Sequence, residues 1–238
     1  MPDAGVVTRS LLALGVDGAD NRTLAARICH ACTEGLDIDG AAISMLTTTD
    51  ARGTLFATDP TAEMLEELQF TLNEGACMEA GTEGNPVLVP DLCDYTELAR
   101  WPVFTAAVLE RTDARALFAL PLQWGAVNLG VLDLYRRTPG VLSGEQQRDA
   151  VGAAEIAALM LLDQVPDPTG ERGTWFDTTV HSRAEVHQAT GMVLMQLDVS
   201  AAEALARMRG HAFAEGRLLI EVARDVVARR LAFTTDSE

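Results

Sequence analysis

Residues 114–135, ARALFALPLQWGAVNLGVLDLY, decide the fold of the larger part of this 238-residue chain. Two short apolar runs, residues 114–123 and 129–135, lie on either side of the segment WGAVN, which contains a glycine and an asparagine. Apolar runs of this length that are bounded by turn-forming residues are typical of buried β-strands. The stretch therefore predicts two β-strands joined as a hairpin.

Further strands are predicted on the N-terminal side of this hairpin. Residues 41–46 and 54–58 are short apolar runs, which we expect to form a strand pair with a turn at Arg52-Gly53. Residues 86–92, PVLVPDL, predict one more strand. Residues 1–20 show only weak patterning, and we expect this N-terminal segment to be frayed.

Helical spacing of apolar residues appears before, between and after these strands. It is seen from Leu24 to Cys32, over residues 62–72, and from Ser143 to Asp163. Ser143 is expected to cap the last of these helices, with Gln146 in the capping-box position. These elements predict an α+β domain over residues 21–164, in which a meandering sheet is flanked by its first and last helices.

Composition and charge restrict the class of protein. Hydrophobic residues make up 48% of the chain, which is enough to build a core. We find no apolar run of about 18 residues and no basic segment that leads into an apolar one at the N-terminus, so we expect neither a membrane span nor a signal peptide. A cytoplasmic protein is the expectation. The net charge of −17 should repel nucleic acid, so any nucleic-acid site would need a local group of arginines.

A linker and a small C-terminal domain follow the α+β domain. Residues 165–175, VPDPTGERGTW, combine two prolines and two glycines, which is typical of a linker. Residues 176–233 are nearly neutral and predict three short helices, and residues 234–238 form a tail.

The first helix of this bundle is expected to start at Ser182, and Ser200 is expected to cap the second in a capping box with Glu203. The second helix should end at Gly216, and the third should start at Leu218. The residues expected to face the core are Val186, Ala189, Thr190, Val193 and Leu197, then Ala201, Leu205, Met208 and Ala212, then Leu219, Val222, Ala223, Val226 and Val227.

The first helix of the bundle has a second apolar face. Met192 and Met195 point away from the core stripe, and Gly191 lies between the two faces. A glycine there would let an identical helix approach closely. We therefore predict a homodimer in which Met192 and Met195 contribute to the dimer face.

The α+β region resembles a GAF domain. The resemblance rests on EGACMEAG (74–81), PVLVPDL (86–92), ARWPVF (99–104), ALFALPL (116–122) and LGVLDLY (129–135), and RWPVF followed by ALPL is similar to the actinobacterial subgroup. It implies a sensor domain with a central antiparallel sheet that carries a ligand-sized pocket on one face. The candidate lining residues are Cys77, Met78, Leu92, Trp101, Phe104 and Phe118, and plain hydrophobic core is the alternative interpretation. The ligand and any cofactor are unknown from the sequence.

The four cysteines leave two further interpretations open. Cys29 and Cys32 lie one helical turn apart, and with Cys77 and Cys93 they would supply four thiolates for zinc. Helical spacing and the lack of a second close pair favour buried thiols instead, and no metal site is predicted. The segment Gly75-Ala76-Cys77 also resembles that of GAF-fold free methionine sulfoxide reductases, but residues 101–105 lack the second cysteine, so we expect no enzyme.

The C-terminal bundle resembles an ANTAR domain. The matching segments are Ala189–Leu194, Glu203–Arg209 and Val222–Val227, and they extend over nearly the whole pattern of that family. The resemblance implies binding of paired RNA stem-loops and antitermination of transcription. Many members have lysine where this chain has Thr190.

The candidate RNA-binding residues are Thr190, Gly191, Arg207, Arg209 and Arg217. Arg209 lies at the edge of the apolar stripe, where it would alternatively cover the core with its methylenes. Arg224, Arg229 and Arg230 are interpreted as a solvated face, and the histidines have no metal-ligand spacing. The sequence thus predicts a signal-sensing RNA-binding regulator, with a thiol redox enzyme and a ligand-binding dimerisation adaptor as alternatives.

Overall fold

The computed structural model describes residues 5–14, 20–46, 52–125, 127–163 and 183–234. Its centre is a five-stranded sheet in the order β2-β1-β5-β4-β3. The strands are β1 (Gly40–Leu46), β2 (Arg52–Ala57), β3 (Val87–Val89), β4 (Ala116–Trp124) and β5 (Val127–Arg136). All neighbouring strands are antiparallel.

The hairpin predicted at residues 114–135 is confirmed. β4 pairs with β5 along its whole length, from Ala116 opposite Arg136 to Trp124 opposite Val127. Apolar side chains alternate between the two faces of these strands, so both faces of the sheet are buried.

Two details of the predicted sheet are wrong. The sheet is not a simple meander, because β1 pairs with β5, its neighbour in space but not in sequence. The prediction of a turn at Arg52-Gly53 is wrong, since both residues belong to β2 and pair with Leu46 and Met45. Residues 47–51, which connect the two strands, lie outside the described residues.

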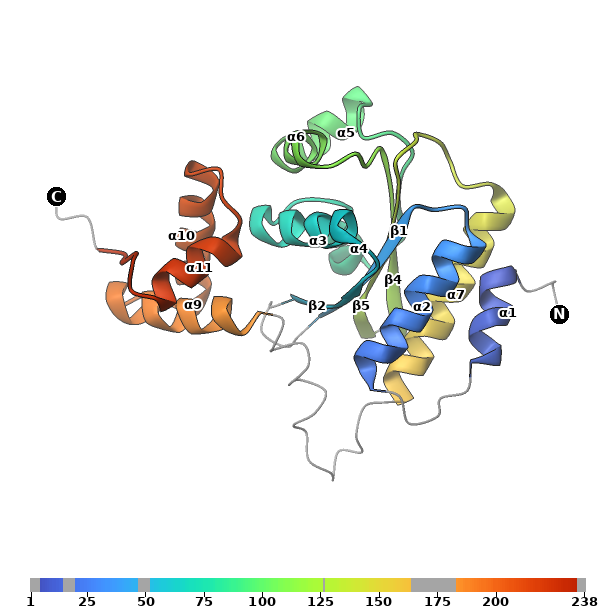
Figure 1. Cartoon of the computed structure of the whole chain (residues 1–238), viewed down its shortest axis with the longest axis horizontal. Coiled ribbons are helices and arrows are strands. Elements are labelled where there is room, and N and C mark those ends of the chain that lie inside the picture. Colours follow the sequence, from blue (N-terminus) through green and yellow to red (C-terminus); the bar gives the residue numbers. More distant parts are fainter. Residues whose placement is uncertain (1–4, 15–19, 47–51, 126, 164–182, 235–238) are drawn as a thin grey trace.

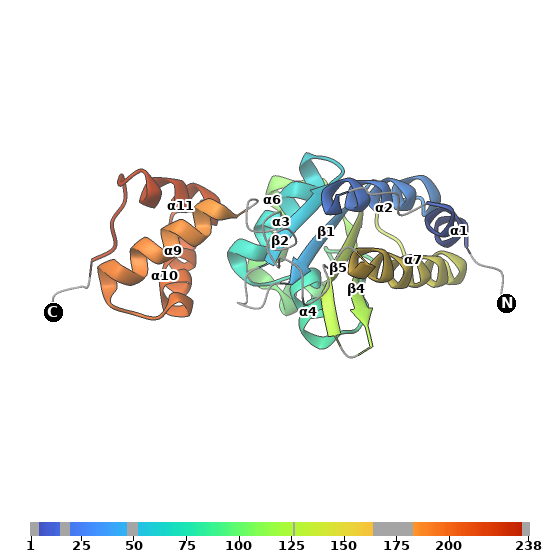
Figure 2. The ribbon, with the colours of Figure 1, turned by 90° about the horizontal axis from the view of Figure 1, so that it is seen from below.

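One face of the sheet is covered by α2 (Asn21–Gly35) and α7 (Gly144–Asp163), with α1 (Val6–Ala13) packed against them (Figure 1; Figure 2). Ser143 and Gln146 form the expected capping box at the start of α7. The expectation of a frayed N-terminus is wrong for residues 6–13. The carboxylate of Asp149 on α7 accepts hydrogen bonds from the backbone N–H groups of Val7 and Thr8, which anchors α1.

The other face carries α3 (Pro60–Leu72), α4 (Ala76–Glu83) and α6 (Pro102–Arg111), and α5 (Tyr95–Arg100) packs against α6. Asp59 caps α3 by accepting from the N–H groups of Thr61 and Ala62. Gly75, just before α4, has φ +116°, a backbone conformation that L side chains rarely adopt. A Cβ at Gly75 would lie 2.7 Å from Oε1 of Gln69, so only glycine lets α4 start this close to α3.

Three helices form the C-terminal bundle: α9 (Ala184–Leu197), α10 (Ala201–Ala214) and α11 (Leu219–Val227). The side chain of Ser200 accepts from the N–H of Glu203, which confirms the predicted cap. Ser182 lies outside the described residues. The prediction that Ala201 faces the core of the bundle is wrong. Ala201 is exposed, and Ala204 points inward in its place.

Phe70 of α3 joins the core of the bundle, although it belongs to the other domain. Figure 1 shows the bundle beside one end of α3. Of the bundle helices, α10 contacts α3 most extensively, followed by α11. The two domains therefore share a hydrophobic junction. Among the described residues, no helix is long and apolar enough to cross a bilayer.

Candidate functional site

Helix α3 lies between the sheet and the bundle and contacts both. Its Glu66 and Gln69 point toward the sheet side, where Glu66 accepts from the hydroxyl of Ser44 and Gln69 accepts from the N–H of Cys77. Its Glu67 and Phe70 point toward the bundle. Since residues three and four apart share a helix face, this one helix contacts the interior of the first domain and the surface of the second.

The Phe70 ring is contacted by two arginines from the bundle. The guanidinium carbon of Arg183 lies 3.6 Å from the ring centroid, and that of Arg209 lies 5.1 Å from it. Nε of Arg209 also donates to the backbone carbonyl of Phe70 at 3.2 Å. Stacking of this kind is worth about 0.5–2 kcal/mol per cation, more when the pair is desolvated.

Arg183 is a buried charge at this junction. Only 3% of its surface is exposed, and its Nη1 lies 3.3 Å from Oε1 of Glu67. Burial lowers the pKa of Arg183, and Glu67 opposes that shift. Burial raises the pKa of Glu67, and Arg183 in turn opposes it. Each group therefore depends on the other to remain charged away from water.

Two more hydrogen bonds cross the junction. The N–H of Leu219, the first residue of α11, donates to Oγ1 of Thr71 at 3.1 Å. Nη2 of Arg111 on α6 donates to the carbonyl of Gly216 at 2.6 Å. These contacts satisfy groups at the ends of α10 and α11, where helices leave backbone groups without intrahelical partners.

The five candidate RNA-binding residues do not form one cluster. Thr190, Gly191 and Arg209 line a common cleft of about 1180 Å³, which Met78 and Trp101 of the first domain also line. The hydroxyl of Thr190 donates to the carbonyl of Val186 at 2.7 Å. The space around Gly191 is open, since a Cβ there would meet nothing within 4 Å.

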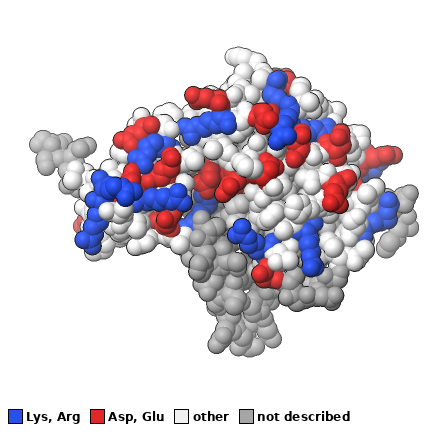
Figure 3. All heavy atoms as spheres, viewed as in Figure 1, with Lys and Arg blue, Asp and Glu red and all other residues white. Residues whose placement is uncertain are grey.

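Arg207 and Arg217 lie outside that cleft and are both paired with acids. Nη2 of Arg207 lies 2.8 Å from Glu203, and Nη2 of Arg217 lies 2.6 Å from Asp225. On the face of the bundle that Figure 3 shows, acidic side chains lie next to the arginines. The Arg207–Glu203 pair is exposed, and exposed pairs contribute little to stability.

The predicted pocket residues divide between the two faces of the sheet. Cys77, Leu92, Trp101 and Phe104 belong to one buried cluster, below α3, α4 and α6. Phe118 belongs to the other cluster, below α2 and α7, so it does not share a surface with them. Neighbouring residues on a strand point to opposite faces, and Phe118 follows Leu117, which faces the first cluster. The assignment of a ligand to this region stays a prediction.

Three residues that can bind metals converge on the same face of the sheet, and the sequence patterns singled out only Cys77 among them. One ligand atom each from Glu66, Cys77 and Asp133 lies within 4.8 Å of the others. Asp133 is in β5 between Val131 and Tyr135, which both belong to the cluster below α3. The one sequence signal for Asp133 as a candidate ligand is its carboxylate within a stripe of buried residues.

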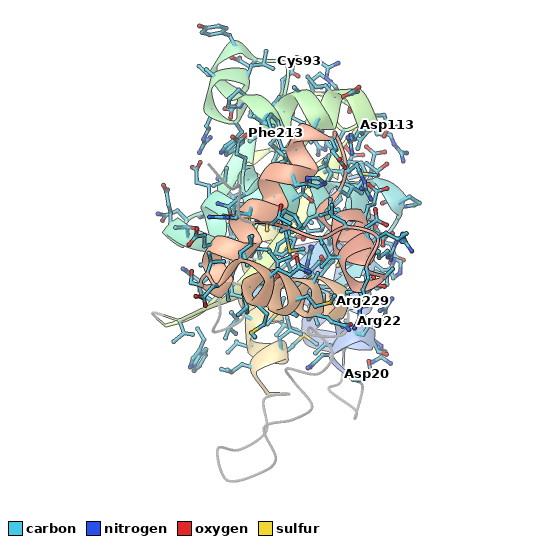
Figure 4. All side chains as sticks on the ribbon, turned by 90° about the vertical axis from the view of Figure 1, so that its left-hand side faces the viewer. Asp20, Arg22, Cys93, Asp113, Phe213 and Arg229 are labelled. Atoms are coloured by element: carbon cyan, nitrogen blue, oxygen red, sulfur yellow. The ribbon has the colours of Figure 1, made fainter. Side chains whose placement is uncertain are left out.

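The four cysteines do not come together, and none forms a disulfide. Cys29 and Cys32 are buried in the core below α2, whereas Cys77 is buried on the opposite side of the sheet. Figure 4 shows Cys93 beside α5, at the far end of the molecule from Asp20. Burial raises the pKa of Cys32 to about 12, and it raises that of Cys29 well above the usual range.

The predicted dimer face is partly covered within the bundle itself. Met195 is 78% exposed, but Met192 packs against the bundle core. Both residues line a surface groove of about 530 Å³ together with Gly191 and Leu231. The homodimer stays a prediction.

Comparisons with known proteins place both parts of the chain. The family model of the GAF domain matches residues 20–164, which is more than half of the chain, and that of the ANTAR domain matches residues 176–227. No curated protein sequence is significantly similar to the chain.

Solved structures show the same fold for the first domain. The GAF domain of a phosphoenolpyruvate-protein phosphotransferase from Coxiella burnetii has a TM-score of 0.53 at 16% identity, over 66% of this chain and 91% of that one. The corresponding domain from Acinetobacter has a TM-score of 0.50 at 11% identity, over 68% and 93% of the two chains. A domain of a putative two-component sensor histidine kinase protein from Sinorhizobium meliloti 1021 has a TM-score of 0.50 at 14% identity, over 61% and 92%. The chain therefore belongs to the GAF domain family and carries an ANTAR domain after its GAF domain.

Proposed function

We propose that this chain is a signal-responsive regulator of transcription rather than an enzyme. Its GAF domain senses a small-molecule or redox signal, and its ANTAR domain binds paired RNA stem-loops and so promotes antitermination in the cytoplasm. Support comes from the order of the two domains and from the junction that joins them.

The contact between Arg209 and Phe70 carries this proposal. Arg209 is the candidate RNA contact that lines the open cleft beside Gly191, and its Nε already donates to the carbonyl of Phe70 on the GAF domain. A bidentate hold on an RNA phosphate through Nε and one Nη would need the Nε that now donates to Phe70. RNA binding therefore competes with the junction, so a signal that loosens α3 would release Arg209.

This competition defines two variants with opposite expected effects. Arg209→Ala removes the RNA contact, and it should weaken RNA binding by about 1–3 kcal/mol. Glu67→Gln removes the partner of Arg183 and leaves Arg209 in place, so it should loosen the junction and strengthen RNA binding. The matched control is Arg22→Ala, which removes the same charge from an exposed residue on α2 and should leave RNA affinity unchanged.

The experiment has two steps. The full-length chain first selects bound RNA from the native transcriptome, and the enriched stem-loop is then titrated with the wild type and the three variants. Failure of both the wild type and Glu67→Gln, in which the junction is loosened, to enrich any RNA would refute the RNA-binding function. Stronger RNA binding in both Arg209→Ala and Glu67→Gln would show that Arg209 serves only the junction, because both changes would then act by loosening it.

A further inference from the structure

We propose that Glu66, Cys77 and Asp133 bind one divalent transition-metal ion, of the zinc type, inside the GAF domain. The three residues come from α3, α4 and β5, and their ligand atoms all lie within 4.8 Å of one another. This inference goes beyond the proposed function, because metal binding at this site does not depend on RNA.

The surrounding structure holds the side chain of Glu66 and the backbone of Cys77. Oε2 of Glu66 accepts a hydrogen bond from the hydroxyl of Ser44 on β1. Gln69 accepts from the N–H of Cys77 at 2.7 Å, which fixes the first turn of α4 against α3. Such supporting hydrogen bonds orient metal ligands and are a regular part of metal sites.

The backbone under Asp133 is equally well fixed. Asp133 lies in the central strand β5, paired with Ala42 on one side and Ala119 on the other. The side chain faces the same side of the sheet as Val131 and Tyr135, which belong to the cluster that contains Cys77. Strand and helix positions hold a ligand set more accurately than loops do.

Glu66 supplies an independent sign that a ligand belongs here. The residue is 4% exposed, and its second oxygen, Oε1, has no hydrogen-bond partner among the described residues. A buried carboxylate oxygen without a partner costs free energy, about 1–3 kcal/mol or more for a charged group. A metal ion bound to Oε1 would remove that cost.

The dimensions fit a single ion. Glu66 and Asp133 line a small cavity of about 10 Å³, roughly the space that one water molecule or one ion needs. Tetrahedral zinc with bonds of about 2.0–2.3 Å places neighbouring ligand atoms about 3.3–3.8 Å apart. Side-chain movements of about 1 Å would therefore close the three groups around the ion.

The ligand types select the class of metal. A thiolate disfavours Mg²⁺ and Ca²⁺, which prefer oxygen ligands only, and it suits zinc and related transition ions. Three protein ligands leave a fourth position for water or another small molecule, as in zinc sites that are not purely structural. The two carboxylates and the thiolate exceed the charge of the ion by one, and Arg183 lies within electrostatic reach of Glu66 and Cys77.

The test uses the full-length chain, reduced and freed of metal with a chelator. Titration with Co²⁺ should give one bound ion per chain and an absorption band of thiolate-to-cobalt charge transfer, and Zn²⁺ should displace the cobalt. Cys77→Ser should abolish the band, and Glu66→Gln should weaken Co²⁺ binding more than about tenfold. The matched controls Cys93→Ser and Glu63→Gln change an exposed thiol and an exposed carboxylate of α3, and both should bind as the wild type does.

Three results would overturn the proposal: no cobalt bound at one equivalent, loss of the band in Cys93→Ser, or wild-type affinity in Cys77→Ser. Circular dichroism establishes that each variant is folded. If Cys77→Ser does not fold, Asp133→Asn decides the matter in its place, since it retains the thiol and should still lose Co²⁺ affinity more than about tenfold. Unchanged affinity in Asp133→Asn would then refute the three-ligand site.

Discussion

Cys29 and Cys32 show how burial sets the chemistry of a single residue. Both thiols lie in the core between α2 and the sheet, where no solvent reaches them, and burial raises their pKa. The thiolate is the reactive form of cysteine, so a pKa of about 12 at Cys32 leaves almost none of it at neutral pH. The helical C-x-x-C spacing therefore produces two inert core residues.

Thiol reactivity tests this directly. In the native protein at neutral pH, iodoacetamide should modify Cys93, which is exposed, and should leave Cys29 and Cys32 unmodified. In denaturant all four cysteines should react at similar rates, because the burial that raises the pKa is lost. Tandem mass spectrometry locates the label within the tryptic peptides 28–52 and 53–100, each of which contains two of the cysteines. Rapid modification of Cys32 in the native state would contradict the buried arrangement.

Helix α1 depends on a side chain of another helix for its N-terminal cap. It packs on α7 through Val7 and Leu11, and its first turn is capped by Asp149 from that helix, not by a residue of its own. The carboxylate also accepts from the hydroxyl of Thr8 at 2.8 Å. A distant residue thus replaces the local cap that the sequence around residue 5 lacks.

Asp149→Ala should therefore release α1 while the sheet stays intact. The loss of the cap leaves two N–H groups without their partner, at an expected cost of about 1–3 kcal/mol. Hydrogen exchange should speed up over residues 6–13 and remain slow in β4 and β5. Glu145→Ala, an exposed acid on the same helix, is the matched control and should leave α1 protected. Unchanged exchange in Asp149→Ala would show that Val7 and Leu11 hold α1 by packing alone.

At the scale of the whole molecule, we predict that the chain forms a homodimer through the outer face of α9. Met195 is largely exposed beside the open space at Gly191, and both residues line one surface groove with Met192. We expect two copies of the chain to pack these faces against each other, as an isologous dimer requires.

Met195→Glu is expected to convert the dimer into a folded monomer. The introduced carboxylates would oppose each other across the two-fold axis, whereas an exposed position costs the monomer little stability. Light scattering at micromolar concentration gives the mass, and circular dichroism monitors the fold. Gln188→Glu, which adds a charge at the edge of the same groove, is the matched comparison and should disturb the dimer less. A wild-type monomer at that concentration would refute this interface.

The sequence by itself determined the features that depend on neighbouring residues. The hairpin of β4 and β5, the capping box at Ser143 and the cap at Ser200 all follow from patterns within a few residues. The two-domain order followed from motifs of the same local kind. Periodicity and capping are local because hydrogen bonds within helices and hairpins join residues that are close in the chain.

Only the tertiary structure decided which distant residues meet. The pairing of β1 with β5, the insertion of Phe70 into the bundle core and the convergence of Glu66, Cys77 and Asp133 join residues far apart in the chain. Phe70 has the pattern of an ordinary core residue whichever domain it packs into, since burial is favourable against any apolar surface. Long-range contacts depend on how the complete set of buried surfaces fits together, and that information is not contained in any short stretch of sequence.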